Sequence, residues 1–251
     1  MRYVSITDQG LVRKNNEDSL AVQPCGDHLL FAVADGMGGH AMGEVASKTA
    51  LNYILSTLPQ EIIRTENQRD LVDLLHQTVV KANIKVFLES LKDPGYYGMG
   101  TTLTLGVLRD WRLYLSHIGD SRAYLLHGSR MDRLTLDHTL VQQMVEEGML
   151  SETDAQVHPK RHVLTRSLGV NEYVIPDTTS FDISEGDILL LCTDGLHGYV
   201  SEKEIKEILR KHKDLELCGQ QLIQAANRSG GHDNVSVVLV HCDRKKNKET
   251  V

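Results

Sequence analysis

The sequence predicts an α+β fold in which antiparallel sheets lie inside and helices lie outside. Strand-like segments occur in adjacent runs and helix-like segments occur in pairs, without a regular alternation of the two. Adjacent strands are typical of antiparallel sheets, whereas strict alternation is typical of parallel sheets. With 251 residues, 41% of them apolar, the chain is long enough to bury a substantial core as one domain.

Nine segments are expected to form strands, because each concentrates β-branched and other apolar residues between turn signals. The clearest are residues 29–34, 101–107, 112–118, 187–192 and 234–241. Weaker patterns cover residues 2–7, 19–23, 121–127 and 178–182.

Four helices are expected from apolar residues spaced at the helical period. Residues 46–58 and 71–86 form a first pair, and residues 205–209 and 217–226 form a second pair. Ser201, followed three residues later by Glu204, resembles a capping box and marks the start of the third helix.

One internal segment and one terminus depart from these patterns. Residues 148–172 are polar and lack a sustained period, which predicts an excursion from the core. The charged end, residues 244–251, is expected to be a flexible tail. Residues 1–243 are therefore expected to form the single domain.

Composition and simple sequence patterns argue against several classes of function and of site. The formal net charge of −7 disfavours binding to nucleic acid or to anionic membranes. The sequence shows no signal-peptide pattern and no apolar run of about 20 residues, which predicts a cytoplasmic location without a membrane anchor. Its four cysteines are scattered without a CxxC pair, so neither a cysteine zinc site nor a disulfide framework is indicated.

Carboxylates recur where the predicted strands end or begin. LLFAVADG delivers Asp35 to a glycine turn, and DILLLCTDG delivers Asp194 in the same way. RLYLSHIGD ends in Asp120, and Asp233 stands just before the last strand. Four acidic side chains can therefore approach one sheet edge.

Close carboxylates repel one another, so they must share protons or bind cations. Oxygen ligands suit Mg²⁺ or Mn²⁺, although His40 and His232 leave zinc open, since imidazole is a common zinc ligand. The competing interpretation is that each Asp-Gly pair is an ordinary turn. Recurrence of the pattern beside strands favours the metal site.

Eight motifs in order carry a family resemblance. They are GLVRKNNEDSL, VADGMGGHAMGEVAS, GMGTTLTLGVL, HIGDSRAYLL, LTLDHTLVQQMVEEG, HPKRHVLTRSLG, LLLCTDGLHGYVS and GGHDNVSVVLV. Together they resemble the metal-dependent protein phosphatases of the 2C type, particularly the compact bacterial branch. The resemblance implies a four-layer α-β-β-α sandwich, with two central antiparallel sheets flanked by helix pairs, and identifies residues 148–172 as the family's flap.

The resemblance also implies roles for the acids. Asp35 would bridge two Mn²⁺ or Mg²⁺ ions, and Gly36 would supply its carbonyl oxygen to one of them. Asp194 and Asp233 would bind the other ion. Asp120, together with Asp194, would hold a third and weaker ion, although an Asp after a strand can also serve as a turn acceptor.

Further positions match residues that handle phosphate and water in the family. Arg13 would grip the phosphoryl group, Asp18 would contact metal-bound water, and Glu17 would support it from the second shell of the metal site. His40 would protonate the leaving oxygen. Because Met37, Gly38 and Gly39 separate His40 from the Asp-Gly pair, the alternative is that His40 shapes its loop.

Two residues of the flap are candidates for contact with substrate. Arg161 and His162 fall in the segment that touches protein substrates in the family. An exposed loop histidine without a functional role is the competing interpretation of His162.

The implied activity is hydrolysis of phosphoserine and phosphothreonine in phosphorylated proteins by a monomer that opposes a bacterial Ser/Thr kinase. One alternative is a phosphatase dedicated to a few regulatory partners, such as anti-sigma-factor antagonists. Another is a non-catalytic binding module, which the intact Asp35, Gly36, Asp194 and Asp233 disfavour.

Overall fold

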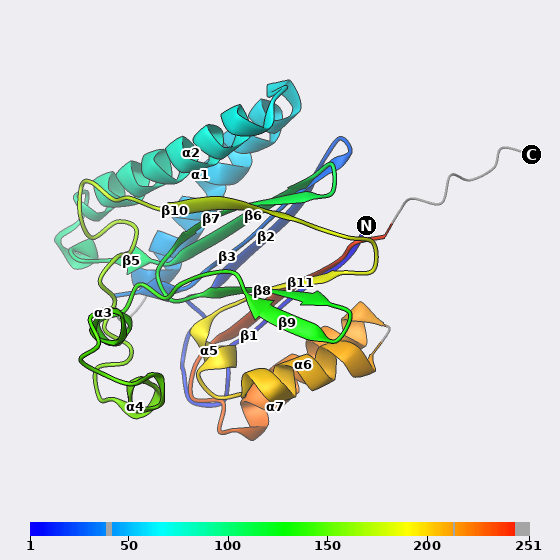
Figure 1. Cartoon of the computed structure of the whole chain (residues 1–251). Helices are drawn as coiled ribbons and strands as arrows, with labels where there is room; N and C mark the ends of the chain where they lie inside the picture. Colours follow the sequence, from blue (N-terminus) through cyan, green and yellow to red (C-terminus); the bar gives the residue numbers. More distant parts are fainter. Residues whose placement is uncertain (39–41, 213, 244–251) are drawn as a thin grey trace, which may run out of the picture.

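Two five-stranded antiparallel sheets form the centre of the computed structural model, which describes residues 1–38, 42–212 and 214–243 (Figure 1). The first sheet has the order β1 (Arg2–Asp8), β12 (Val235–His241), β11 (Ile188–Cys192), β8 (Arg122–His127) and β9 (Arg130–Arg133). The second has the order β10 (Asp177–Asp182), β7 (Arg112–Ile118), β6 (Leu103–Arg109), β3 (His28–Ala34) and β2 (Ser19–Cys25). A short pair, β4 (Gly36–Met37) and β5 (Gly100–Thr101), continues from the second sheet.

Helix pairs cover the outer faces of both sheets (Figure 1). On the second sheet lie α1 (Met42–Arg64) and α2 (Gln68–Ser90), and on the first lie α6 (Glu202–Lys211) and α7 (Leu215–Arg228). Shorter helices are η1 (Pro94–Tyr96), α3 (Leu140–Glu146), α4 (Glu152–Val157) and α5 (Asp194–His197). This arrangement confirms the predicted four-layer sandwich.

Three apolar layers hold the sandwich together, because each sheet buries both of its faces. Phe31, Leu189 and Val238 are fully buried between the two sheets. One outer cluster joins α1 and α2 to the second sheet, and another joins α6 and α7 to the first. The predicted capping of α6 is also present, since the Ser201 hydroxyl accepts a hydrogen bond from the Glu204 amide.

The structure differs from the sequence-based expectation in several places. The predicted strand 101–107 is divided at Thr102, because the Thr102 hydroxyl accepts a hydrogen bond from the Asp35 amide. The excursion 148–172 contains the short helix α4, which Ser151 caps. Leu217, the first residue of the apolar pattern 217–226 that predicts α7, is 42% exposed. The predicted tail, 244–251, lies outside the described residues.

None of the described helices is long and apolar enough to cross a membrane.

Candidate metal and phosphate site

The predicted acidic residues meet at one cleft of about 900 Å³, formed where strands of both sheets end. Asp35 follows β3, Asp120 follows β7, Asp194 follows β11, and Asp233 stands two residues before β12. Predicted site residues lining the cleft are Arg13, Glu17, Asp35, Gly36, Asp120, His162, Asp194 and Asp233. His40 lies outside the described residues.

The backbone at Asp35 is held by hydrogen bonds from the start of the neighbouring strand. Its amide donates to the Thr102 hydroxyl at 2.9 Å, and its carbonyl oxygen accepts from the Thr102 amide at 2.9 Å. The Thr101 hydroxyl donates to the same carbonyl at 2.9 Å. The Asp35 side chain is therefore carried on a fixed main chain at the rim of the sheet.

Asp18 lies beneath the cleft and is 7% exposed. Its Oδ2 accepts hydrogen bonds from the Ser236 hydroxyl at 2.6 Å and the Thr193 hydroxyl at 2.9 Å. Its Oδ1 is buried and has no hydrogen-bond partner among the residues that the structure describes. Burial, partly opposed by those two hydroxyls, raises the pKa of Asp18 to about 7.

The cluster carries negative charge that protein groups do not fully balance. Loss of hydration, followed by repulsion from Asp18 and Asp194, holds the pKa of Asp35 well above the ordinary carboxyl value. Burial followed by repulsion from Asp194 raises the pKa of Asp120 similarly. Asp194 differs: burial would raise its pKa, but His162 and His197 hold that pKa below the ordinary value.

Divalent cations fit this donor set by charge and by ligand chemistry. Several crowded carboxylates and the unpartnered Oδ1 of Asp18 offer hard oxygen donors. Within the described ranges, however, no group of three or more His, Cys, Asp or Glu side chains is arranged to hold an ion by itself. Mg²⁺ sites usually keep several waters beside one or two carboxylates. The cluster is therefore suited to Mg²⁺ or Mn²⁺ with water completing the shell.

Arg13 lies at the rim of the cleft, where its Nη2 contacts Asp233 Oδ2 at 2.8 Å. Its side chain is 55% exposed, so the guanidinium can also reach a ligand in the cleft. Desolvation would lower the pKa of Arg13, but the negative charges of Asp233, Asp194 and Asp35 outweigh this effect and raise the pKa above its ordinary value. A fixed positive charge consequently faces the acidic cluster.

The flap contributes one of its two predicted residues to the cleft. His162 Nδ1 lies 3.4 Å from Asp194 Oδ2, and its side chain is 47% exposed. Arg161 is not among the residues that line the cleft. The structure thus brings His162, and not Arg161, to the acidic cluster.

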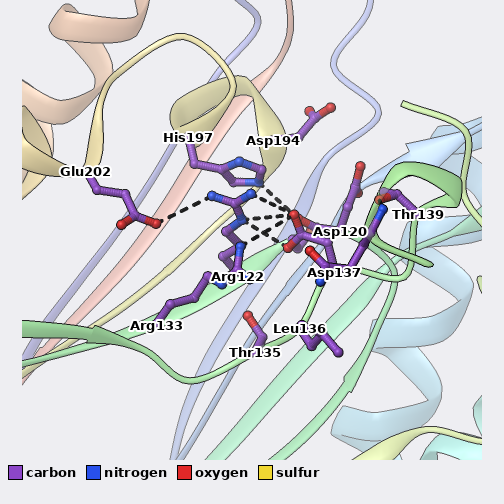
Figure 2. Close-up of polar contacts among 12 residues, drawn as sticks. Asp120, Arg122, Arg133, Thr135, Leu136, Asp137, Thr139, Asp194, His197 and Glu202 are labelled. Atoms are coloured by element: carbon purple, nitrogen blue, oxygen red, sulfur yellow. Dashed lines mark hydrogen bonds and ion pairs between the residues drawn. The ribbon is translucent and has the colours of Figure 1, made fainter. Parts of the chain in front are cut away.

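A polar network behind Asp120 fixes the turn that carries it (Figure 2). Gly119, at φ 103°, forms the turn, and a side chain there would collide with Thr102. His197 Nε2 donates to the Asp120 carbonyl oxygen at 2.9 Å. Burial lowers the pKa of His197 to about 4, so this ring is neutral at pH 7.

Arg122, two residues beyond Asp120, forms a bidentate ion pair with Asp137 (Figure 2). Its Nε lies 2.9 Å from Oδ1 and its Nη2 lies 2.6 Å from Oδ2. Arg122 and Asp137 are 18% and 11% exposed. Such a paired, largely buried guanidinium braces this loop.

Sequence reasoning missed the residues that support the acids from behind. Thr193 and Ser236 were detectable in principle, because each interrupts an apolar strand beside an acid, in LLLCTDG and DNVSVV. Asn234 was also missed; its Oδ1 accepts from the Glu17 amide at 2.9 Å, and its Nδ2 donates to the carbonyls of Gln9 and Asn15. These contacts fix the loop of residues 9–17 against the start of β12.

Comparison with known proteins gives a consistent result. The family model described as protein phosphatase 2C matches residues 4–235. The serine/threonine phosphatase stp of Listeria monocytogenes is 37% identical over 94% of this chain and 94% of its own length.

Solved structures agree with the sequence matches. The crystal structure of the Mycobacterium tuberculosis serine/threonine phosphatase PstP/Ppp has a TM-score of 0.88 and 39% identity, covering 97% of this chain and 99% of that one. A crystal structure of the PstP catalytic domain in complex with two manganese ions has a TM-score of 0.83 and 39% identity, covering 95% and 96% of the two chains.

Proposed function

We propose that this chain, which belongs to the protein phosphatase 2C family, hydrolyses phosphoserine and phosphothreonine in proteins in a reaction that requires divalent metal ions. The observation that carries the proposal is the convergence of Asp35, Asp120, Asp194 and Asp233 on one cleft with Arg13 at its rim. A relative that matches over 94% of both chains is a serine/threonine phosphatase. The intact carboxylates disfavour a non-catalytic binding module.

The residues divide into a cation-binding group and a phosphate-binding group. Asp35, Gly36, Asp194 and Asp233 would hold two ions, Mn²⁺ or Mg²⁺, and Asp120 with Asp194 would hold a third. When bound, such ions lower the pKa of water and neutralise charge on the phosphoryl oxygens. The two manganese ions in the related PstP structure support the count of two.

Arg13 would bind the phosphoryl group, because its guanidinium offers paired donors that match two phosphoryl oxygens. It would also stabilise the charge that develops there during hydrolysis. Asp18 would orient water from beneath the cleft, with its carboxylate held by Thr193 and Ser236. Glu17 would support Asp18 from the adjoining loop position, and His40 would be the proton donor to the leaving oxygen.

His162 and Arg161 would contact the protein part of the substrate from the flap. His162 lines the cleft and lies beside Asp194, and this position within reach of a bound substrate supports the role of His162. We further infer a cytoplasmic monomer, 1–243 forming one catalytic domain, that opposes a bacterial Ser/Thr kinase. The phosphatase fold of the relatives supports phosphorylated proteins as substrates.

Peptides carrying phosphoserine, phosphothreonine or phosphotyrosine test the proposed substrate class. With Mn²⁺ present, phosphate release is expected from the first two and not from the third. Mg²⁺ in place of Mn²⁺ tests the choice of ion in the same assay. Release confined to the phosphotyrosine peptide, or absent from all three, would refute the proposed function.

Arg13→Ala is expected to raise KM for a phosphothreonine peptide by about 10-fold or more, because the phosphoryl oxygens lose a bidentate partner. Mn²⁺ affinity should persist or increase, since Asp233 no longer pairs with a guanidinium. Steady-state kinetics and a Mn²⁺ titration measure the two effects.

Arg130→Ala is the matched control for Arg13→Ala, because Arg130 pairs with Asp132 at 2.8 Å on the exposed strand β9. It should leave both values unchanged. A wild-type KM in the Arg13→Ala enzyme would show that Arg13 does not bind the phosphoryl group.

A further inference from the structure

Asn83 is a polar residue with no exposed surface in the buried face of α2. A fully buried asparagine is unusual unless its amide is hydrogen-bonded. Two other buried polar residues of this helix, Thr78 and Ser90, donate from their hydroxyls to carbonyls of α2 itself. Asn83 instead makes its bonds outside the helix.

The Asn83 amide binds three main-chain groups of one distant segment. Its Oδ1 accepts from the Gly169 amide at 2.8 Å, and its Nδ2 donates to the carbonyls of Asn171 and Glu172, each at 3.0 Å. One side chain therefore uses both its acceptor and its donors to hold residues 169–172. We call this segment the cleft wall, because Val170 and Asn171 line the cleft.

The cleft wall is attached to the site on its other side as well. Leu168 and Thr101 exchange two main-chain hydrogen bonds, of 2.8 and 3.0 Å, and Thr101 donates to the Asp35 carbonyl. Gly169 has φ +88°, and a side chain there would collide with Val86 of α2. The wall is consequently held close against α2 on one side and against the metal-site main chain on the other.

We propose that Asn83 is a positioning residue that holds the cleft wall in the conformation needed to accept the peptide part of the substrate. The inference rests on the proposed phosphatase function. A phosphoryl group fills only part of a cleft of about 900 Å³, so the parts of its lining away from the acidic cluster, such as Val170 and Asn171, face the rest of the substrate. Val170, 42% exposed, presents an apolar side chain there.

Asn83→Ala removes all three bonds and is expected to raise KM for a phosphothreonine peptide by about 10-fold, since small displacements of positioning groups carry large penalties. Hydrolysis of p-nitrophenyl phosphate, which has no peptide part, should stay within about 2-fold of wild type. The Gly169 amide should exchange with solvent deuterium at least about 10-fold faster, because its acceptor is gone.

Thr78→Val is the matched control, because it changes a buried polar residue of α2 that bonds within the helix. It should alter neither KM nor exchange at Gly169. Val170→Ala changes the wall at an exposed position, so it tests the peptide contact even if Asn83→Ala does not fold. It should raise peptide KM while leaving p-nitrophenyl phosphate hydrolysis and Gly169 exchange near wild type.

Each result has a definite meaning. Parallel losses on the peptide and on p-nitrophenyl phosphate in Asn83→Ala, or an unchanged peptide KM in Val170→Ala, would overturn the positioning role. Absence of metal-dependent activity from the wild-type enzyme on both substrates would instead refute the proposed function. Deuterium exchange at the Gly169 amide does not depend on catalysis, so it tests the hydrogen bond to Asn83 whether or not the enzyme is active.

Discussion

Asp35→Asn is expected to lower the rate of phosphopeptide hydrolysis by at least about 100-fold, because loss of even an outer-shell partner costs up to about 100-fold and Asp35 would bind the ions directly. The substitution keeps the shape of the side chain but removes a charge at the centre of the acidic cluster. The hydrogen bonds between the Asp35 main chain and Thr101 and Thr102 do not involve the Asp35 side chain, so the fold should be retained. Steady-state phosphate release measures the effect.

The same variant should also change the thermal stability of the metal-free protein. Because Asp18 and Asp194 repel the Asp35 carboxylate, its removal should raise the melting temperature without metal. The further rise on adding Mn²⁺ should shrink, since binding to the folded state is weakened. Asp182→Asn, on a side chain that is 87% exposed, is the control. Wild-type activity together with a wild-type Mn²⁺ response in Asp35→Asn would contradict the assigned metal site.

Asp137→Ala is expected to destabilise the protein by about 3–5 kcal/mol, the range for removing one partner of a buried ion pair. Arg122 would keep a charge in a site where its side chain is 18% exposed, with Tyr124 at 3.1 Å and Glu202 at 3.6 Å as remaining partners. Urea unfolding at pH 7 measures the loss. A double variant, Arg122→Met with Asp137→Leu, should be less destabilised than Asp137→Ala, because the buried guanidinium that loses its carboxylate is removed as well.

The contribution of this ion pair should also depend on pH in a defined direction. Burial would raise the pKa of Asp137, but the hydrogen bonds and charge of Arg122 hold that pKa below the ordinary value. The stabilisation is therefore fully present above the unfolded-state pKa of Asp and is lost as the pH falls through the lower folded-state value. A free energy of unfolding within about 1 kcal/mol of wild type in Asp137→Ala would show that the pair is not a major support.

The layers of the fold were predictable because each depends on local apolar patterns. Strand β3 is apolar throughout after His28, β12 is apolar apart from Ser236 and its last residue, and α1 and α2 show the helical period. Strand β9, with the sequence RMDR, was missed because it is polar and lies at a sheet edge. Helix α4 was missed because its six residues are too few to show a period.

The acids of the site were predictable for a related reason. Each follows or precedes a strong strand, and antiparallel topology brings those strand ends to one edge. Roles for Arg13 and Asp18 came from family resemblance instead, and the structure places Arg13 at the rim and Asp18 beneath the cleft.

Supporting contacts could not be predicted from sequence because they join residues far apart in the chain. Asn83 binds a segment 86 or more positions away, and Ser236 binds Asp18 across 218 positions. Neither contact leaves a local pattern, because a single polar residue in an apolar element has many explanations. Such residues become identifiable once the fold shows which main-chain groups they satisfy.

If phosphoester hydrolysis depends on divalent ions bound in the acidic cleft, activity must follow the amount of bound metal. A Mn²⁺ titration tests this claim when bound ion, measured by electron paramagnetic resonance, and phosphate release from a phosphothreonine peptide are followed in the same samples. Activity should rise with bound Mn²⁺, fall to background with EDTA, and return when Mn²⁺ is restored. Phosphate release that persists in EDTA, or Mn²⁺ binding that Asp35→Asn and Asp194→Ala leave unchanged, would contradict the claim.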